Sequence, residues 1–423
     1  MRSGRLRLSR DAWLLVAGQG VRAAGYGFTA VVLGALLAAR GYTPLQAGLV
    51  LTALIAGTAL ASLAVGRFAD RFGRRRTYGV FFAGVAAAGA VVAVGAPLWM
   101  LLVVAVTGTL STDVVDNGPA TTLEQAMLAA EDAGTAGVYG VYNAVGAAAG
   151  ALGALAVAGL GAQGEGGRVH AWLFAVLIPV GAAGVVIAVR LSPAVEAPGA
   201  GRPARVRARL GASQPVVRRL AGLFAVDAAG GGLVTTGFLS YFLAERYHAS
   251  ATGLGWLFFA VSVVQAVSVA LAPLLARRFG LLTTMVGTHL PSNVLLAAVA
   301  FAPTFPVAAA LLLARTTLSQ MDVPTRQALV MTAVTPQERT AAAAVTNAAR
   351  YTIRPAGPLL AGAVQQVALG APLVVAGAVK AGYDVTLWAW ARGLGLGARV
   401  RPADPGTAGA VPTALAMEPG RKR

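Results

Sequence analysis

The chain has 423 residues, of which 57% are hydrophobic and only 12% are charged. Soluble domains carry about 25% charged residues, so a soluble fold of this size would lack the polar side chains to cover itself. Disorder is excluded for the same reason, because such chains are polar and strongly charged. The composition predicts an all-α membrane protein with many spans.

Residues that commonly act as nucleophiles, general bases or metal ligands are scarce. The chain has no cysteine and three histidines, which leaves little material for thiolate chemistry, a metal site or a Ser-His-Asp triad. It also lacks a G-x-x-x-x-G-K-[ST] nucleotide loop. We therefore expect no enzyme activity, no catalytic residue, no metal and no cofactor, with a proton gradient as the source of energy.

Twelve apolar stretches are long enough to cross a bilayer, which takes roughly 20 residues. The longest polar stretch between them is rich in Pro, Gly and Arg, and it separates two sets of six. The predicted spans are 13–39, 47–66, 77–96, 98–122, 136–160, 171–189, 220–243, 254–275, 282–302, 307–330, 341–365 and 371–394. The predicted domains are an N-terminal six-helix bundle (1–189), a cytosolic linker (190–219), a C-terminal six-helix bundle (220–394) and a disordered cytosolic tail (395–423).

Basic residues fall on one side of this topology. With a cytosolic N-terminus, 25 of the 34 basic residues lie in cytosolic segments, and only Arg40, Arg168 and Arg246 lie in outer loops. This asymmetry follows the positive-inside rule and accounts for the net charge of +18 without a nucleic-acid partner. We expect both termini in the cytosol, in a bacterial cytoplasmic membrane, with lipid as a partner.

The two halves repeat at an offset of about 207 residues, since Asp70-Arg71-Phe72-Gly73 aligns with Arg277-Arg278-Phe279-Gly280. Pro119 and Asn143 find counterparts in Pro324 and Asn347 at nearly the same offset. A repeat of six plus six spans about an axis along the membrane normal is typical of one class of transporter.

The loop after the second span carries the most specific motif. It reads Gly66-Arg67-Phe68-Ala69-Asp70-Arg71-Phe72-Gly73-Arg74-Arg75-Arg76. This resembles the signature loop of the major facilitator superfamily, G-x-L-[AS]-D-[RK]-x-G-[RK]-[RK], with Phe68 in place of leucine. The resemblance covers about 13–394. It implies twelve helices in two pseudo-symmetric bundles, a small-molecule substrate and a monomer.

The resemblance also implies roles for the loop's residues. Asp70 would pair with basic groups and with a helix N-terminus of the other half, and so latch one conformation. Gly66 would let the second span approach a neighbouring helix closely. A plain basic hairpin is the alternative, and it explains the arginines but neither the glycines nor the aspartate. The predicted latch residues are Gly66, Asp70, Arg71, Gly73 and Arg74.

Ionisable residues inside spans are costly and face the bundle interior by default. Five acids and six bases qualify, and this near balance indicates pairing. They are Asp113, Asp116, Asp227, Asp322, Asp384, Arg22, Arg315, Arg326, Arg350, Arg354 and Lys380.

In the first half, Arg22 lies near the middle of the first span, which lines the central cavity in the resembling family. It is a candidate for binding substrate or protons, or else for a structural pair with Asp113 or Asp116. Those two acids share one face of the fourth span, and mutual repulsion favours protonation of one of them. We expect proton coupling there, preferably at Asp116 because Pro119 distorts the helix nearby.

In the second half, Asp322 and Arg326 form an i, i+4 pair if the helix continues past Pro324. That proline would leave the carbonyl of Gln320 free to bind substrate, water or an ion, with a bare kink as the alternative. Asp227 precedes a Gly-Gly-Gly run and is a candidate for gating or for plain helix contact. These four polar residues are the predicted coupling and cavity residues of this half.

Two further pairs have open interpretations. Lys380 and Asp384 are i, i+4 in the twelfth span, where a structural ion pair is favoured. Arg350 and Arg354 share a face of the eleventh span. They either bind an anionic substrate group, pair with acids of other spans, or snorkel to the cytosolic end. His289 is predicted to be a hydrogen-bonded core histidine.

The direction of transport has a weak signal. Gly146, Gly150 and Gly153 keep the glycine spacing of a motif that proton-antiport exporters of the family carry in the fifth span, without its proline. The exporters' basic motif in the fourth span is missing. Proton-coupled efflux is the favoured function and proton-coupled uptake the alternative, followed by a channel or a non-transporting receptor.

Overall fold

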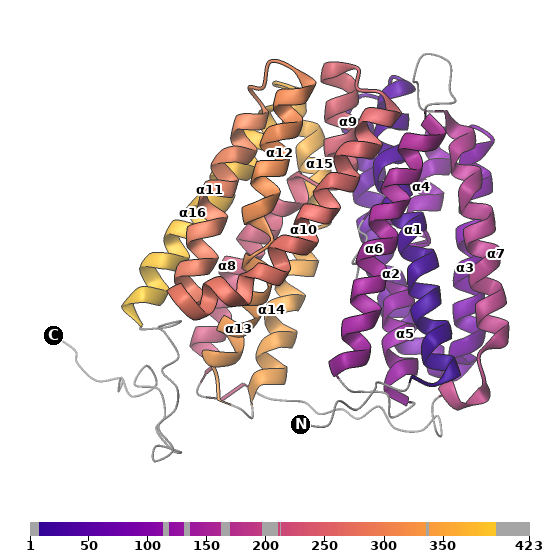
Figure 1. Cartoon of the computed structure of the whole chain (residues 1–423), viewed down its shortest axis with the longest axis horizontal. Coiled ribbons are helices and arrows are strands. Elements are labelled where there is room, and N and C mark those ends of the chain that lie inside the picture. The colour runs from indigo at the N-terminus through magenta and orange to yellow at the C-terminus, as the bar shows by residue number, and fades with distance from the viewer. Residues whose placement is uncertain are drawn as a thin grey trace. The chain divides into compact units, whose positions relative to one another are not determined.

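The computed structural model describes residues 8–112, 118–130, 136–161, 170–196, 210–211, 213–335 and 338–394. These residues form helices joined by short turns, and no strand occurs among them (Figure 1). Two compact units divide the chain. Unit 1 comprises Met1–Pro203, Leu233–Val263 and Pro355–Pro372, and unit 2 comprises Ala204–Gly232, Val264–Arg354 and Leu373–Arg423.

The helices of unit 1 come mostly from the first half of the chain. They are α1 (Arg10–Ala39), α2 (Pro44–Phe72), α3 (Arg74–Ala93), α4 (Leu98–Val106), α5 (Pro119–Ala130), α6 (Ala136–Gly161), the 3-10 helix η2 (Ala171–Val176), α7 (Leu177–Arg190), the 3-10 turn η3 (Pro193–Val195), α9 (Thr236–Tyr247) and α15 (Ala356–Gln365). The helices of unit 2 are α8 (Gln214–Leu233), α11 (Leu281–Val299), α12 (Phe305–Ser319), α13 (Asp322–Thr332), α14 (Arg339–Ile353) and α16 (Ala371–Gly393), and α10 (Ala251–Phe279) runs through both units.

Each predicted span coincides with one helix or with two consecutive ones. Among the residues that the structure describes, eight helical segments are long and apolar enough to cross a membrane. Four predicted spans are broken in two, and the pairs are α4 and α5, α8 and α9, α12 and α13, and α14 and α15.

Local chemistry explains where the broken spans stop. In the seventh span the break follows the Gly-Gly-Gly run, and the Thr235 hydroxyl caps α9 by accepting a hydrogen bond from the N–H of Phe238 at 3.2 Å. In the tenth span the helix ends at Ser319, and Pro324 lies in the first turn of α13, where a missing N–H is tolerated. The break therefore precedes Pro324.

The repeated loop motif has the same backbone in both copies. Gly73 joins α2 to α3 with φ of +93°, and Gly280 joins α10 to α11 with φ of +91°. Side chains strongly disfavour that region, so glycine is needed at both positions. The internal repeat is thus visible in the backbone of two hairpins.

Within unit 1, glycines bring α1 and α6 into backbone contact. A Cβ placed on Gly27 would lie 2.0 Å from the carbonyl oxygen of Gly150, and one on Gly153 would lie 2.0 Å from that of Ala24. Such small-residue contacts let helices approach closely in a membrane. The glycine spacing of the fifth predicted span therefore has a packing function.

Replacing Gly153 with alanine is expected to destabilise the protein, because a backbone carbonyl must move and overpacking typically costs about 1–3 kcal/mol. Gly159→Ala on the same helix is the matched control, since its Cβ would meet no atom within 4 Å and alanine favours the helix. The melting temperature of purified Gly153→Ala should fall below that of the wild type, and the melting temperature of Gly159→Ala should not. Equal melting temperatures would contradict the packing argument.

Unit 1 also contains two helices from the second half of the chain. A Cβ on Gly34 of α1 would lie 2.0 Å from the carbonyl oxygen of Gly237 in α9, and one on Gly48 of α2 would lie 2.5 Å from that of Pro358 in α15. The division into units reflects these contacts. It does not test the predicted domain boundaries, which stay predictions.

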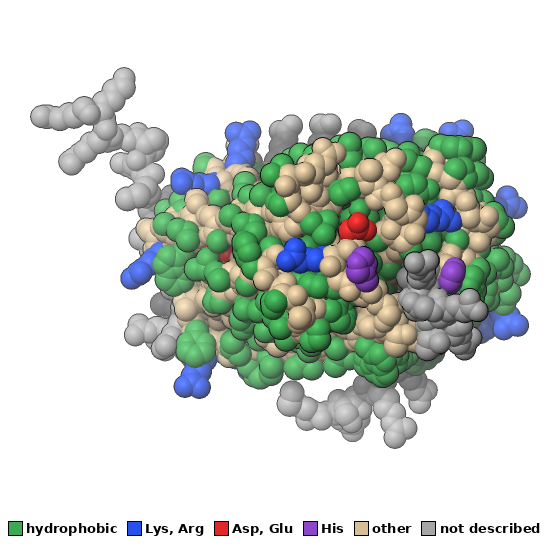
Figure 2. Space-filling view, turned by 90° about the horizontal axis from the view of Figure 1, so that it is seen from above, with side chains coloured by type: hydrophobic (Ala, Val, Ile, Leu, Met, Phe, Trp, Pro, Cys, Tyr) green, Lys and Arg blue, Asp and Glu red, His purple; other side chains and the backbone are tan. Residues whose placement is uncertain are grey.

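The exterior carries many exposed apolar side chains. Leu63, Val80 and Phe301 are each more than 70% exposed. Hydrophobic side chains also cover much of the face shown in Figure 2, with basic side chains scattered singly. An apolar exterior around helices whose backbone groups are satisfied internally suits a lipid environment.

Candidate transport site

A buried ion pair lies in the interior of unit 1. Arg22 of α1 is 1% exposed, and its Nη2 lies 2.9 Å from Oε2 of Glu124 in α5, which is fully buried. The same nitrogen also donates to the side chains of Thr121, at 2.9 Å, and Gln19. Burying a charge without partners would be prohibitive, so these contacts keep Arg22 in the interior.

Two tyrosines complete the surroundings of Glu124. The hydroxyl of Tyr78 in α3 donates to Oε1 at 2.6 Å, and that of Tyr142 in α6 donates to Oε2. Side chains from α1, α3 and α6 thus donate to one carboxylate on α5. Nε and Nη1 of Arg22 have no hydrogen-bond partner among the described residues, so the guanidinium keeps donors to offer.

Arg22 has a partner that the sequence interpretation did not name. Asp113 and Asp116 lie outside the described residues, so their pairing with Arg22 stays a prediction, while Glu124 pairs with Arg22 among the described residues. The sequence interpretation missed Glu124 because it ended the fourth span at residue 122. The available signal was the apolar run Ala-Met-Leu-Ala-Ala at 126–130, which continues the helix beyond Glu124.

A second buried network lies within unit 2 and centres on Asp227 of α8. Its Oδ1 accepts a hydrogen bond from Nζ of Lys380 in α16, and its Oδ2 lies 3.4 Å from Nη1 of Arg326 in α13. Arg326 also pairs with Asp322 at 2.7 Å. One carboxylate is therefore shared by two permanent cations, one of which has a second acid.

His289 of α11 links Asp227 to another acid. Its Nε2 lies 3.8 Å from Oδ1 of Asp227, and its Nδ1 lies 2.8 Å from Oδ1 of Asp384. Asn293, one turn further on, donates to Oδ2 of Asp384 at 2.9 Å. The imidazole therefore bridges two carboxylates that come from two different helices.

Two expectations for this half were wrong. Lys380 bonds to Asp227 on another helix, while Asp384 takes its hydrogen bonds from His289 and Asn293. The carbonyl of Gln320 is not free either, because it accepts the N–H of Val323 at 3.4 Å. Because α12 ends at Ser319 and Pro324 lies in the first turn of α13, the missing N–H of Pro324 does not leave a helical carbonyl without its donor.

The loop between α2 and α3 shows only some of the contacts that were predicted for its residues. Asp70 pairs with Arg74 at 2.6 Å and its side chain is 57% exposed, and Arg74 also donates to the carbonyl of Ala126 in α5 at 3.0 Å. Gly66 does not mediate a close helix approach, since a Cβ there would meet nothing within 4 Å. Arg71 is exposed. The latch function of this loop stays a prediction.

A glutamate just beyond the sixth span caps α3. Both carboxylate oxygens of Glu196 accept backbone N–H groups, from Arg74 at 2.7 Å and from Arg75 at 3.2 Å. An anion at a helix N-terminus satisfies unpaired donors and interacts favourably with the helix dipole. Sequence reasoning missed this residue because it lies in a polar stretch interpreted as linker.

Glu338 has a similar structural function before α14. The side chain of Ser213, the N–H of Gly211 and the hydroxyl of Thr335 surround its carboxylate and hold the pKa of Glu338 below its ordinary value. A lowered pKa means that the carboxylate stabilises the fold above the unfolded-state pKa of about 4.3, and that this stabilisation disappears as pH falls through the folded-state value.

We therefore expect the wild type to lose more stability than Glu338→Gln between neutral pH and about pH 3, where both carboxyl states are sampled. Melting temperatures of the purified full chain over this range measure the difference. Parallel curves for the two proteins would show that the contacts of Glu338 do not affect its titration.

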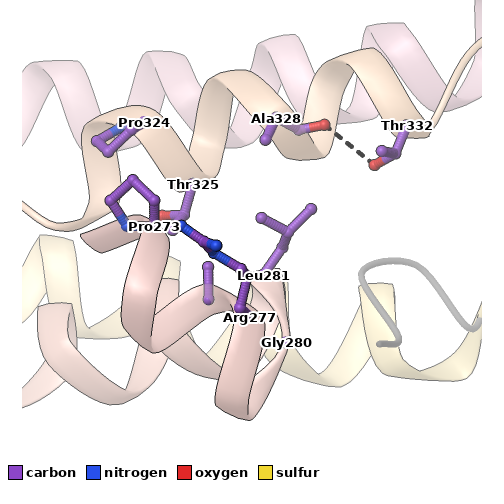
Figure 3. Close-up of a pocket in the computed structure, with 9 residues that line it drawn as sticks. Pro273, Arg277, Gly280, Leu281, Pro324, Thr325, Ala328 and Thr332 are labelled. Atoms are coloured by element: carbon purple, nitrogen blue, oxygen red, sulfur yellow. Dashed lines mark hydrogen bonds between the residues drawn. The ribbon is translucent and has the colours of Figure 1, made fainter. Parts of the chain in front are cut away.

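A pocket of about 420 Å³ lies within unit 2, between α10, the start of α11 and α13 (Figure 3). Pro324, Thr325, Ala328 and Thr332 line it from α13. Its one charged lining residue is Arg277, and no residue of the Asp227 network lines it. The pocket is therefore separate from the buried charges.

In the described part of the chain, apolar helices long enough to cross a bilayer, an apolar exterior and buried ion pairs between helices define a multi-pass membrane transport protein. A sequence profile of the Major Facilitator Superfamily matches residues 15–358, and the chain belongs to this family. The predicted fold class, twelve helices in the arrangement of that family, is confirmed.

Similar proteins agree with this assignment. The chain is 26% identical over 397 residues to the uncharacterized membrane protein YJR124C of Saccharomyces cerevisiae, covering 84% of this chain and 88% of the relative. The crystal structure of the nucleoside transporter NupG matches with a TM-score of 0.72 at 12% identity, covering 91% of this chain and 99% of that one. The D-xylose-proton symporter matches with a TM-score of 0.62 at 14% identity, over 89% and 97% of the two chains.

Proposed function

We propose that the protein is a proton-coupled secondary transporter that moves a small organic molecule across a bacterial cytoplasmic membrane by alternating access. The observation that carries the proposal is the sharing of Asp227 among Lys380, Arg326 and His289. A buried acid with competing cationic partners changes its pairing when a proton arrives. The likeness to a solved proton symporter supports coupling to protons.

The chemistry of the network suggests how a proton acts. Protonation of Asp227 removes the counter-charge of Lys380, while Arg326 keeps its 2.7 Å pair with Asp322. His289 contacts Asp384 through its other nitrogen, so it keeps one carboxylate partner when Asp227 changes its pairing. Transport is driven only if the proton binds one conformation more tightly than the other. Asp113 and Asp116 remain candidates for the same function.

We propose efflux as the direction, on the glycine spacing of α6, although those glycines also serve packing against α1. Uptake is the second candidate, favoured by the solved symporter to which the fold is similar. Both functions use a monomer without a cofactor, and both place the termini in the cytosol.

The test uses the full chain in inside-out membrane vesicles with a preformed proton gradient and a pH-sensitive dye. Compounds are added one at a time, and vesicles without the protein are the control. Solute-dependent proton release supports antiport. Solute-dependent proton movement only in right-side-out vesicles supports uptake. Solute flux that is unaffected by a proton gradient in either orientation would overturn proton coupling.

A further inference from the structure

The pocket of about 420 Å³ in unit 2 combines a cation with room for a ligand. Arg277 lines it from the last turn of α10, and Figure 3 shows the Arg277 side chain between α10 and α13. Arg277 forms no hydrogen bond or ion pair with any residue that the structure describes. Since pockets of about 300–1,000 Å³ hold small ligands, this one can take a group that pairs with Arg277.

The other lining residues favour an anion as that group. The hydroxyl of Thr325 donates to the carbonyl of Met321 at 2.9 Å, and that of Thr332 donates to the carbonyl of Ala328 at 3.1 Å (Figure 3). Neither hydroxyl has a proton left to donate to a ligand. Among the described residues that line the pocket none is acidic, so the charge of Arg277 is uncompensated there.

The internal repeat gives an independent comparison. In the first copy of the hairpin, the carboxylate of Glu196 accepts the N–H groups of Arg74 and Arg75 at the start of α3. In the second copy, α11 begins after Gly280 with the same backbone turn, and no side-chain hydrogen bond caps it. Gly280 and Leu281 line the pocket. The pocket therefore lies where the first copy binds oxygens of an anion.

An exposed apolar stripe on α10 leads to this pocket. Val267, Leu271 and Leu274 are 55%, 41% and 54% exposed, and their spacing of four and three residues places them on one face of the helix. The stripe ends one turn before Arg277 and Arg278, at the end of a helix long enough to cross a bilayer. Among the candidate spans of the described residues, α10 has the smallest buried share. An apolar face that ends in cations matches a lipid with an anionic headgroup.

We propose that the pocket binds the phosphate of an anionic phospholipid, whose acyl chains lie along the stripe. Arg277 pairs with the phosphate, and the lipid serves at the start of α11 as Glu196 serves at the start of α3. Basic pockets between membrane helices are suited to lipid headgroups. A zwitterionic lipid carries the same phosphate together with a cation, which Arg277 and Arg278 repel. A soluble phosphate gains nothing from the apolar stripe.

The first experiment measures the melting temperature of the purified full chain in a neutral detergent. The probes are phosphatidylglycerol, phosphatidylcholine with the same acyl chains, and glycerol phosphate as a soluble headgroup. A ligand of the folded state raises the melting temperature with its concentration, and we expect this rise with phosphatidylglycerol alone. Equal stabilisation by phosphatidylcholine would overturn recognition of the charge. Equal stabilisation by glycerol phosphate would assign the pocket to a soluble anion and overturn the lipid proposal.

The second experiment compares variants of the lining. Arg277→Gln should weaken binding of phosphatidylglycerol at least about tenfold. Arg278→Gln is the matched control, because it removes the same charge from a guanidinium that lies 5.5 Å from the ring of Phe279 and does not line the pocket. Ala328→Leu, which fills the pocket from α13 and keeps both charges, should weaken binding as well.

Native mass spectrometry of the folded variants counts the phosphatidylglycerol molecules that stay bound, so that binding is measured separately from stability. We expect one molecule fewer on Arg277→Gln and on Ala328→Leu than on the wild type and on Arg278→Gln. Undiminished binding by Arg277→Gln would overturn the proposal. Equal losses in Arg277→Gln and Arg278→Gln would indicate a general attraction to the basic loop and would overturn the pocket as the site.

Discussion

Glu124→Gln is expected to lower the stability of the protein by about 3–5 kcal/mol, the usual cost of removing one member of a buried ion pair. The change keeps the size of the side chain but leaves Arg22, which is 1% exposed, without a counter-charge. It also weakens the hydrogen bonds that Tyr78 and Tyr142 donate to an anion. The melting temperature of the purified full chain, with ligand absent, measures the loss.

The double variant Arg22→Gln with Glu124→Gln should recover much of that stability, because neither charge then remains buried alone. Gln125→Ala, at the exposed neighbouring position of α5, is the control and should change stability by less than about 0.5 kcal/mol. If Glu124→Gln melts like the wild type, the pair does not hold α1, α3, α5 and α6 together. If the double variant is as unstable as the single one, the loss comes from the tyrosines.

Asp227→Asn is expected to abolish proton-driven solute flux while leaving solute exchange in the absence of a gradient. Asparagine cannot be charged, so Lys380 and His289 lose the acid whose protonation would alter their pairing. The assay is solute-dependent proton movement in vesicles, compared with counterflow of the same solute. Since a lysine remains buried without its anion, reduced yield is expected as well.

Two other aspartates give the matched comparisons. Asp70→Asn, in the exposed loop, should slow turnover but keep the ratio of protons to solute, because Asp70 pairs only with Arg74 among the described residues. Asp116→Asn tests the acid that sequence reasoning preferred. Full coupling in Asp227→Asn together with lost coupling in Asp116→Asn would move the proton site to the fourth span.

The sequence by itself determined the class of protein, the number of spans and the position of the repeated loop. These follow from local properties. An apolar run of about 20 residues has few alternatives to crossing a bilayer, and its basic flanks set its direction. The repeated loop was visible as a sequence motif, and the structure adds that Gly73 and Gly280 both adopt φ near +90°, a region that favours glycine.

Only the tertiary structure decided which buried charges meet. Sequence spacing favoured Lys380 with Asp384, four residues apart, but Lys380 bonds to Asp227, 153 residues away. Likewise Arg22 pairs with Glu124, 102 residues away. Spacing along one helix shows which side chains share a face, whereas helix rotation and the close approach allowed by small residues decide what that face meets. Charge pairing between helices is therefore a property of packing, which no single stretch of sequence contains.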